Sequence, residues 1–366
     1  MQDSSSSMSS QKEFLNPFLG VPKDSSLDPA GKNFSAKAWL SNLVGFISND
    51  PSSYHPRYAG VSFRNLNVYG FTTATDYQKN VFNILLGIGD VFRWAAGTRK
   101  KQRVQILRDF DGLVESGEML LVLGRPGSGC STLLKTISGD THGFFVDVES
   151  NINYQGIPAK QMHSQFRGEA IYMAETDVHF PFLTVGQTLL FAAKARAPRD
   201  NTFPGVTRDM FAEHMRDVIM ASFGLNHTIN TNVGSALVPG TSGGERKRVS
   251  IAEAALSGSP LQCWDNSTRG LDSANALEFC KTVRLSADLT GITAFVSLYQ
   301  GSQDTYDVRS LPPLLVFYFL TLARFLTRSL FCTKGVRYTL GLALKPNITS
   351  PAWVSSVHCD KLPQTF

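Results

Sequence analysis

A glycine-rich turn, GRPGSGCST, directly follows an apolar run at residues 118–123 and is the strongest chemical motif of the chain. Its glycines let backbone N–H groups turn inward around phosphate oxygens, because a β-carbon would block so close an approach. The helix expected next would point its N-terminus, which attracts anions, at the same phosphates. The pattern therefore predicts a phosphate-binding loop formed by Gly124, Arg125, Pro126, Gly127, Ser128, Gly129, Cys130, Ser131 and Thr132.

One position departs from the usual GxxxxGK[ST] pattern of such loops. Cys130 stands where a lysine would contact the β- and γ-phosphates, and a thiol cannot supply that charge. Ser131 is in place to hold Mg²⁺. The alternative is an ordinary Gly-rich turn. We favour the phosphate loop because a predicted strand precedes the turn and a predicted helix follows it.

A second motif, TSGGERKR at residues 241–248, opens a predicted helix. Ser242 is a good N-cap, and the start of a helix is an anion site. A plain capped helix is the alternative interpretation, which only the order of motifs along the chain can exclude. The residues of this motif that we assign to the candidate site are Ser242, Gly243, Gly244 and Glu245.

A third motif begins where the apolar run at residues 261–264 ends in Asp265. A carboxylate at the end of such a strand can hold the Mg²⁺ of a bound nucleotide. The next residue, Asn266, cannot act as a general base at neutral pH. The stretch GLDSA at residues 270–274 follows and includes Asp272.

The apolar runs alternate with helical stretches, and this pattern is typical of an α/β fold. We predict strands at 118–123, 261–264 and 292–298, with helices at 242–256 and 273–286 between them. Such alternation indicates a parallel sheet with crossover connections. Toward the N-terminus, we expect a strand at 61–68 and a helix at 81–94. We favour a core helix there over one that lies at a membrane surface.

Composition and charge narrow the function classes. The 366 residues are 42% hydrophobic and 18% charged, as expected of a globular protein. The net charge of +5 is too diffuse to indicate a nucleic-acid partner, and we expect the basic runs 99–103 and 246–248 to be solvated faces. The apolar run 314–323 is shorter than the roughly 20 residues of a membrane-spanning helix.

The order of the motifs resembles the ATP-binding-cassette (ABC) family, with its Walker A, signature, Walker B and D-loop elements. The residues within these motifs resemble most closely those in the first nucleotide-binding domain of fungal pleiotropic-drug-resistance transporters of the G subfamily. The resembling stretches are NLNVYGFTTATDYQKNVFNILL at 65–86, GRPGSGCSTLLK at 124–135, AETDVHFP and LTVGQTL within 174–189, SGGERKRVSIAE at 242–253 and DNSTRGLDS at 265–273. The resemblance covers about residues 36–308. It implies a P-loop NTPase fold of the ABC type, with a helical signature subdomain and an antiparallel edge. It also implies that the chain binds ATP and Mg²⁺, with Ser131 and Asp265 as the Mg²⁺ ligands.

The resemblance also marks four departures from the catalytic pattern. They are Cys130 for the loop lysine, Asn266 for the catalytic glutamate, Glu175 for the Q-loop glutamine and Tyr299 for the switch histidine. One interpretation is that these substitutions accumulated by mutational drift in a gene that no longer functions. We favour asymmetry, because all four departures fall in the chain's own nucleotide site while the signature is intact. The chain's own site would then bind ATP with little or no hydrolysis, and Ser242 and Gly244 would complete the catalytic site of a partner domain.

Four segments are expected along the chain: a disordered tail at 1–35, an N-terminal extension at 36–104, the ABC nucleotide-binding domain at 105–308 and an aberrant tail at 309–366. Read in another frame, residues 325–341 can encode FDKVxVLYEGRQIYFG and residues 353–366 can encode GFECPLRQATADF. Both products resemble the family. This indicates a retained intron at 309–324 followed by an exon read out of frame. A divergent tail with a membrane-associated segment is the alternative.

These observations predict the ATP-binding domain of an ABC drug-efflux transporter. Its partners would be a second nucleotide-binding domain and transmembrane domains, with no nucleic acid. The complete transporter would place it on the cytosolic face of the plasma membrane, and the chain by itself would be cytosolic. The alternatives are a non-transporting ATP-binding fragment and a soluble ABC ATPase. Whether the chain alone hydrolyses ATP is left open, because its catalytic glutamate and loop lysine are replaced.

Overall fold

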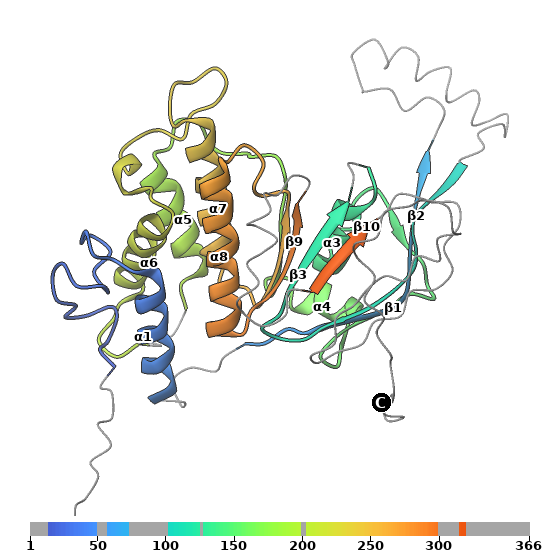
Figure 1. Ribbon diagram of the computed structural model, residues 1–366, viewed down its shortest axis with the longest axis horizontal. Helices are drawn as coiled ribbons and strands as arrows, with labels where there is room; N and C mark the ends of the chain where they lie inside the picture. Colours follow the sequence, from blue (N-terminus) through green and yellow to red (C-terminus); the bar gives the residue numbers. More distant parts are fainter. Residues whose placement is uncertain are drawn as a thin grey trace, which may run out of the picture.

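A five-stranded parallel sheet forms the centre of the computed structural model, which describes residues 14–49, 57–72, 102–124, 127–198, 203–298 and 315–319 (Figure 1). In spatial order its strands are β10 (Leu315–Phe319), β3 (Met119–Gly124), β9 (Thr293–Leu298), β8 (Leu261–Asp265) and β7 (Ala170–Met173). Strands β8 and β9 are buried throughout, since helices cover both faces of the sheet, so they read as continuous apolar runs. The three strands predicted at 118–123, 261–264 and 292–298 are confirmed.

The helices on the two faces carry different parts of the predicted site. Helix α3 (Cys130–Ser138) packs on one face through Leu133, Leu134 and Ile137. Helices α7 (Gly243–Ala255) and α8 (Ser273–Thr290) lie on the other face, to the left of the strands in Figure 1. Both helices predicted for this region are confirmed.

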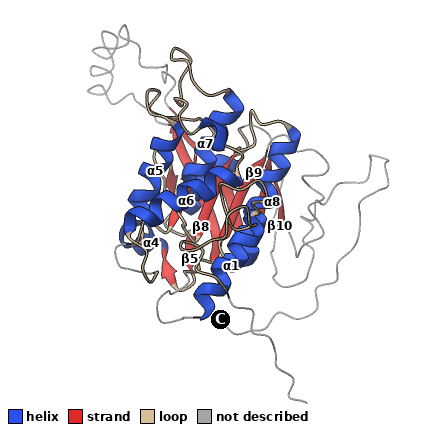
Figure 2. Ribbon diagram, turned by 90° about the vertical axis from the view of Figure 1, so that its left-hand side faces the viewer, coloured by secondary structure: helices blue, strands red, loops and turns tan. Residues whose placement is uncertain are grey.

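A helical subdomain joins α7 to α5 (Val185–Arg196), α6 (Arg208–Ser222) and a 3-10 turn at Asn226–Thr228. Their shared core includes Leu189, Met220 and Val249. In Figure 2 these helices lie together in front of the strands. The helical signature subdomain predicted from the resemblance is therefore present.

An antiparallel sheet covers the α3 side. It contains β2 (Gln102–Val114), β1 (Val61–Thr72), β5 (Asn151–Tyr154) and β6 (Ile157–Pro158), with β4 (Phe145–Val146) paired to β1 and α4 (Ala159–Gln165) following β6. The strand predicted at 61–68 is the first part of β1. Its inward side chains share one core with α3. The helix predicted at 81–94 lies outside the described residues.

The N-terminal segment packs on the helical subdomain. We expected a disordered tail at 1–35, but residues 14–35 form turns, and the Phe18 ring lies 4.5 Å from that of Phe203 and 6.3 Å from that of Trp39. Phe18 is only 9% exposed. Helix α1 (Ala36–Asn49) continues from this segment, so residues 14–49 are part of the folded body. Residues 1–13 lie outside the described part.

Part of the segment expected to be aberrant takes a place in the sheet. Strand β10 pairs in parallel with β3, from Leu315 opposite Leu120 to Phe319 opposite Gly124. In this part of the 314–323 run, the backbone is therefore paired with β3. A translated intron would instead be expected to have no partner in the fold. The rest of 309–366 lies outside the described residues. Among the residues that are described, none of the helices has the length and apolar character to cross a membrane.

Candidate nucleotide site

The predicted phosphate loop connects β3 to α3, as its sequence requires. Gly127 and Gly129 have φ values of +82° and +99°, a left-handed conformation that glycine adopts without strain. Gly129 stands directly before the first turn of α3, whose N-terminus begins at Cys130. Arg125 and Pro126 lie outside the described residues. The described part thus has the strand, turn and helix order that a phosphate loop needs.

Cys130 is a core residue. Its side chain is 1% exposed, packs in the cluster that holds Leu133, and has its Sγ 3.3 Å from the Ser128 Oγ. Burial raises the pKa of the Cys130 thiol above its usual range, so the group is neutral at physiological pH. Cys130 therefore contributes to the packing of the core and supplies no positive charge to a phosphate.

Asp265 ends β8 and is held by two hydroxyl groups. The Ser297 Oγ donates to its Oδ1 at 2.7 Å, and the Tyr172 Oη donates to its Oδ2 at 2.7 Å. Burial, followed by the hydrogen bond to Asp265, raises the pKa of Tyr172, so the phenol stays a donor. Asp265 is 2% exposed and offers a fixed carboxylate on β8, against which α3 packs. Carboxylate and hydroxyl oxygens are donors that Mg²⁺ prefers, so the chemistry of Asp265 and Ser131 fits the predicted Mg²⁺ site.

Asn266 follows this strand in a left-handed conformation with φ of +44°. Asparagine is among the few residues that tolerate such a conformation. Its backbone N–H donates to the Ser297 Oγ at 2.9 Å, and its Nδ2 donates to the Glu175 Oε1 at 3.0 Å. At 5% exposure, Asn266 is a structural hydrogen-bond donor at the position where a catalytic base would stand.

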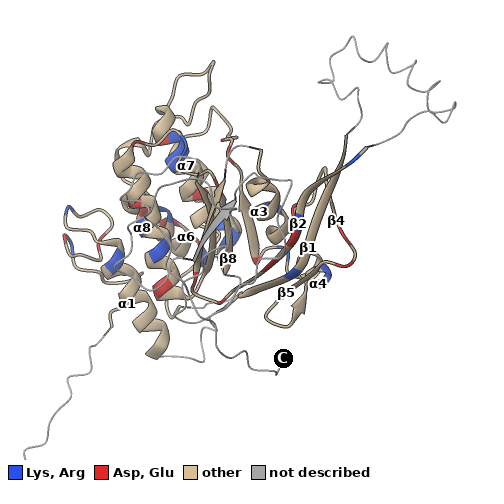
Figure 3. Cartoon of the chain, turned by 45° about the vertical axis from the view of Figure 1, so that its right-hand side comes forward, with Lys and Arg blue, Asp and Glu red and all other residues tan. Residues whose placement is uncertain are grey.

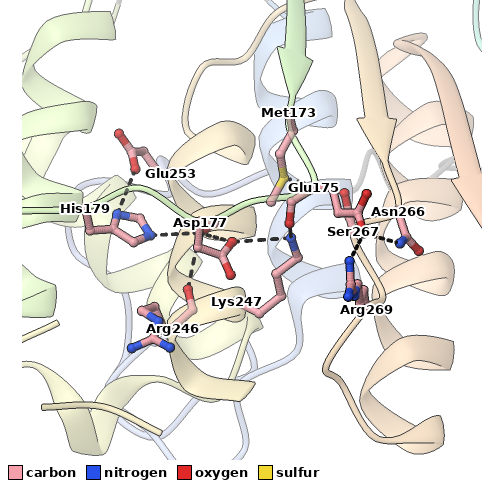
Figure 4. Close-up of polar contacts among 11 residues, drawn as sticks. Met173, Glu175, Asp177, His179, Arg246, Lys247, Glu253, Asn266, Ser267 and Arg269 are labelled. Carbon is pink, nitrogen blue, oxygen red and sulfur yellow. Dashed lines mark hydrogen bonds and ion pairs between the residues drawn. The ribbon is translucent and has the colours of Figure 1, made fainter. Parts of the chain in front are cut away.

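Glu175 joins Asn266 to a third residue. The Arg269 guanidinium pairs with the same Glu175 oxygen that accepts the Asn266 amide (Figure 4). Two of the four predicted departures, Asn266 and Glu175, are therefore one hydrogen-bonded group with Arg269. Sequence analysis had not singled out Arg269, which lies 94 residues from its partner. Tyr299, the fourth departure, lies outside the described residues.

Lys247 corrects the expectation that the run Arg246–Lys247–Arg248 is a solvated face. Its side chain is 2% exposed, and its Nζ donates to the Glu175 backbone oxygen at 2.8 Å and to the Asp177 Oδ1 at 3.3 Å. Charged lysines are rarely buried without such partners. Helix α7 is thus fixed to the loop that carries Glu175 (Figure 4).

The same loop makes further contacts with α7. The Ser250 Oγ donates to the Asp177 Oδ1 at 2.7 Å and lies 2.7 Å from the His179 Nε2. The Glu253 Oε2 is 3.6 Å from the His179 Nδ1, and burial lowers the pKa of this histidine. No short-range pattern marks these residues, because the loop and the helix are about 70 positions apart in the chain.

The predicted signature opens α7 through a reciprocal cap. The Ser242 Oγ accepts from the Glu245 backbone N–H at 3.3 Å, and the Glu245 Oε2 accepts from the Ser242 N–H at 2.8 Å. Ser242 and Gly243 are exposed, and Gly244 is half-buried. The start of the helix is therefore open to a ligand or partner while its cap is complete.

Asp272 lies at the start of α8 and is exposed. It occupies the N-cap position of this helix, and the Asn275 Nδ2 donates to its Oδ1. This hydrogen bond lowers the pKa of Asp272, so its carboxylate is ionised at neutral pH. The residue presents a negative charge on the same side of the sheet as the signature helix.

The cap on α7 predicts a pH dependence of stability. Hydrogen bonds from Ser242, with His227 adding to them, lower the pKa of Glu245 to about 2. Because the folded pKa lies below the unfolded value of about 4.3, this stabilisation is complete above that value and is lost as the pH falls toward 2. Glu245→Gln keeps the cap geometry without the charge, so its melting temperature should lie below that of the parent at pH 7. Melting curves between pH 7 and pH 3 should show the gap closing in acid; a constant gap would contradict this origin.

Known proteins with similar sequences were found for most of the chain. The profile of the family described as "ABC transporter" matches residues 107–269, and that of "ABC-transporter N-terminal" matches residues 1–84. The chain is 66% identical to the ABC multidrug transporter atrG of Aspergillus oryzae over 293 residues, which are 80% of this chain and 20% of that protein. It is 65% identical to the ABC multidrug transporter C of Aspergillus fumigatus over 293 residues, 80% of this chain and 19% of that protein.

A third relative matches over the same share of the chain. The ABC-type transporter oblD of Cochliobolus heterostrophus is 60% identical over 292 residues, which are 80% of this chain and 19% of that protein. The chain thus spans about a fifth of the length of these relatives. Among solved structures, the ATP-binding cassette MJ0796 overlaps with a TM-score of 0.46 at 17% identity, over 66% of this chain and 88% of that chain, a likeness too slight to carry an argument.

Proposed function

Since this chain belongs to the ABC transporter family, we propose that it is the first nucleotide-binding domain of a drug-efflux transporter. Its own Walker site binds Mg–ATP and does not turn it over. Its signature, with Ser242 and Gly244, completes the catalytic site of a second nucleotide-binding domain. In the complete transporter it lies on the cytosolic face of the membrane, against the transmembrane domains.

The hydrogen bond from Asn266 to Glu175 carries this proposal. A base at this position would have to accept a proton from the attacking water. Here the side chain is an amide whose Nδ2 donates to a carboxylate at 3.0 Å, so the position is engaged in holding the loop. Cys130, buried and neutral, leaves the phosphate loop without its lysine. The loop glycines still supply backbone N–H donors for the phosphates, and Ser131 and Asp265 supply oxygen ligands for Mg²⁺.

The placement of the signature supports a role toward a second domain. The phosphate loop leads into α3 on one face of the parallel sheet, and the signature opens α7 on the other face (Figure 1). Ser242 and Gly243 are exposed rather than turned into the chain's own loop. A nucleotide at this signature would therefore come from a partner.

An exposed apolar loop supports a further protein partner. Val178, Phe180 and Phe182 are 84%, 76% and 75% exposed, and Phe191 on the adjacent α5 is 74% exposed. Exposed aromatic groups gathered on one segment are typical of an interaction surface. This loop also includes Asp177 and His179, which contact α7, so a partner docked here would touch the segment that fixes the signature helix.

Binding without turnover is the expected behaviour of the purified chain. At Mg–ATP concentrations about 100 times the dissociation constant, the domain should gain about 2.7 kcal/mol of stability, seen as a higher melting temperature. Phosphate release should stay at the level of a blank. Gly129→Val, which places a branched side chain at φ of +99° in the loop, is the matched control and should show no shift. Sustained multiple turnover by the chain alone would contradict the proposal.

A further inference from the structure

A cavity of about 630 Å³ lies on the α8 side of the parallel sheet, between α1, α6 and α8. Its walls are mainly apolar, with Trp39 and Leu43 from α1, Met215 from α6 and Leu289 from α8. Its volume is in the range of small-molecule sites in proteins. The N-terminal segment supplies one wall, so this space exists because residues 14–49 pack on the domain.

The cavity is elongated along α8. Phe279, Val283, Ser286 and Thr290 line it and recur every three or four residues, so they form one stripe of the helix. At 1.5 Å per residue, the stripe from residue 279 to residue 290 is about 16 Å long. An apolar slot of this length can hold an extended acyl chain.

The two ends of the slot differ. One end is closed by Trp264, 2% exposed, whose ring stands edge-on to that of Phe279 at 5.3 Å. At the other end, Tyr58 lies against Gly291, just after α8, and Arg57 precedes Tyr58 in the chain. Arg57 also donates to the Gly258 oxygen at 3.1 Å. The apolar end is thus deep in the domain, and the polar end is at the exit of α8.

The polar end carries positive charge. Arg57 and Arg196 are the charged side chains among the described residues that line the cavity, and no carboxylate is among those residues. Both lie at the turn that includes residues 168 and 169: Arg196 donates to the Gly168 oxygen, and Arg57 pairs with Glu169 at 2.7 Å. Glu169 offsets one of the two cations, which leaves one net positive charge beside the opening.

We propose that this cavity binds a single-chain amphiphile with an anionic head group, of the long-chain fatty acid class. The tail lies along α8 toward Trp264, and the carboxylate lies at the opening beside Arg196 and Arg57. Charge complementarity selects an anion over a neutral or cationic amphiphile, and the volume of about 630 Å³ limits the size of its apolar part. The proposal does not depend on ATP turnover or on the partner domain.

Two of the four tryptophans, Trp39 and Trp264, line the cavity and report its occupant. In the full chain with Trp94→Phe and Trp353→Phe, dibromostearic acid should quench their fluorescence saturably, below its micellar concentration and at one molecule per chain. Unbrominated stearic acid should compete. The methyl ester, which lacks the charge, should bind about tenfold more weakly, and Arg196→Gln should remove that difference. Equal binding of acid and ester would overturn the head-group assignment.

Filling the slot tests its location. Ser286→Phe on α8 and, independently, Ser222→Phe on α6 place a ring in the cavity and should abolish saturable quenching. Lys281→Phe adds the same ring on the exposed side of α8 and should leave quenching unchanged. Cooperative thermal unfolding shows which variants are folded. Saturable quenching that persists in a folded filled variant, or no saturable quenching in the parent, would overturn the proposal.

Discussion

Asn266→Glu, which restores the residue type of a catalytic base, is expected to destabilise this domain at neutral pH. The new carboxylate would stand where the Asn266 Nδ2 now donates to the Glu175 Oε1 at 3.0 Å. Two carboxylates at this separation do not both ionise without cost, and Arg269, which is 71% exposed, offsets only part of one charge. Loss of a hydrogen bond to a charged group costs about 1.5–3 kcal/mol, and the melting temperature should fall accordingly.

Asn266→Gln is the matched control for this prediction. It has the length of glutamate, keeps an amide, and meets the same left-handed backbone at φ of +44°. Any difference between the two variants therefore reports the added charge. The like-charge contact raises the pKa of one carboxyl above its unfolded value, so the penalty should shrink as the pH falls from 8 to 5. Equal melting of the two variants at every pH would contradict the prediction.

Glu175→Gln should rescue Asn266→Glu. The glutamine amide can donate to the new carboxylate, which reverses the present hydrogen bond without two like charges in contact. The double variant should melt close to Asn266→Gln, which carries the same left-handed strain, so the two changes are strongly non-additive. Additive effects would show that Asn266 and Glu175 act independently. A rescue would show that Asn266 and Glu175 depend on each other, so that a base at residue 266 also requires a change at residue 175.

Local features of the sequence predicted the central strands, the helices α7 and α8, and the glycine-rich turn between β3 and α3. The phosphate loop depends on adjacent residues, and glycines with φ values of +82° and +99° stand where the motif requires them. Strands β8 and β9 were predictable because their burial on both faces leaves continuous apolar runs. The cap of α7 was predictable because Ser242 and Glu245 are three residues apart and complete each other.

The remainder depends on contacts between distant parts of the chain. Lys247 looked solvated within a basic run, but the Glu175 backbone oxygen, 72 residues away, satisfies its ammonium group and permits its burial. Arg269 lies within the stretch DNSTRGLDS, but its pairing with Glu175 was not predictable because the two residues are 94 positions apart. Phe18 stands in a polar segment, and its core partners, which include Trp39 and Phe203, come from other parts of the chain. Spacing along a sequence does not encode such pairs.

Removal of residues 309–366 is expected to have a large effect, because β10 is the outer neighbour of β3. Five residues of β10 pair in parallel with Leu120–Gly124, which end at the phosphate loop. Without β10, the backbone of β3 loses those hydrogen bonds, each worth about 0.5–1.5 kcal/mol, and β3 becomes an edge strand. We expect a chain ending at Val308 to melt several degrees lower than the full chain, to bind Mg–ATP more weakly and to be less soluble.

A chain ending at Phe319 separates β10 from everything after it. It keeps the paired strand and should melt with the full chain, because the stabilisation expected from this tail comes from β10. The two truncations therefore test opposite interpretations of the tail. If the chain ending at Val308 is instead the more soluble and the more cooperative in unfolding, residues 315–319 contribute nothing to the sheet. The segment would then behave as translated intron, and replacing it with the alternative reading that begins FDKV should restore the missing edge of β3.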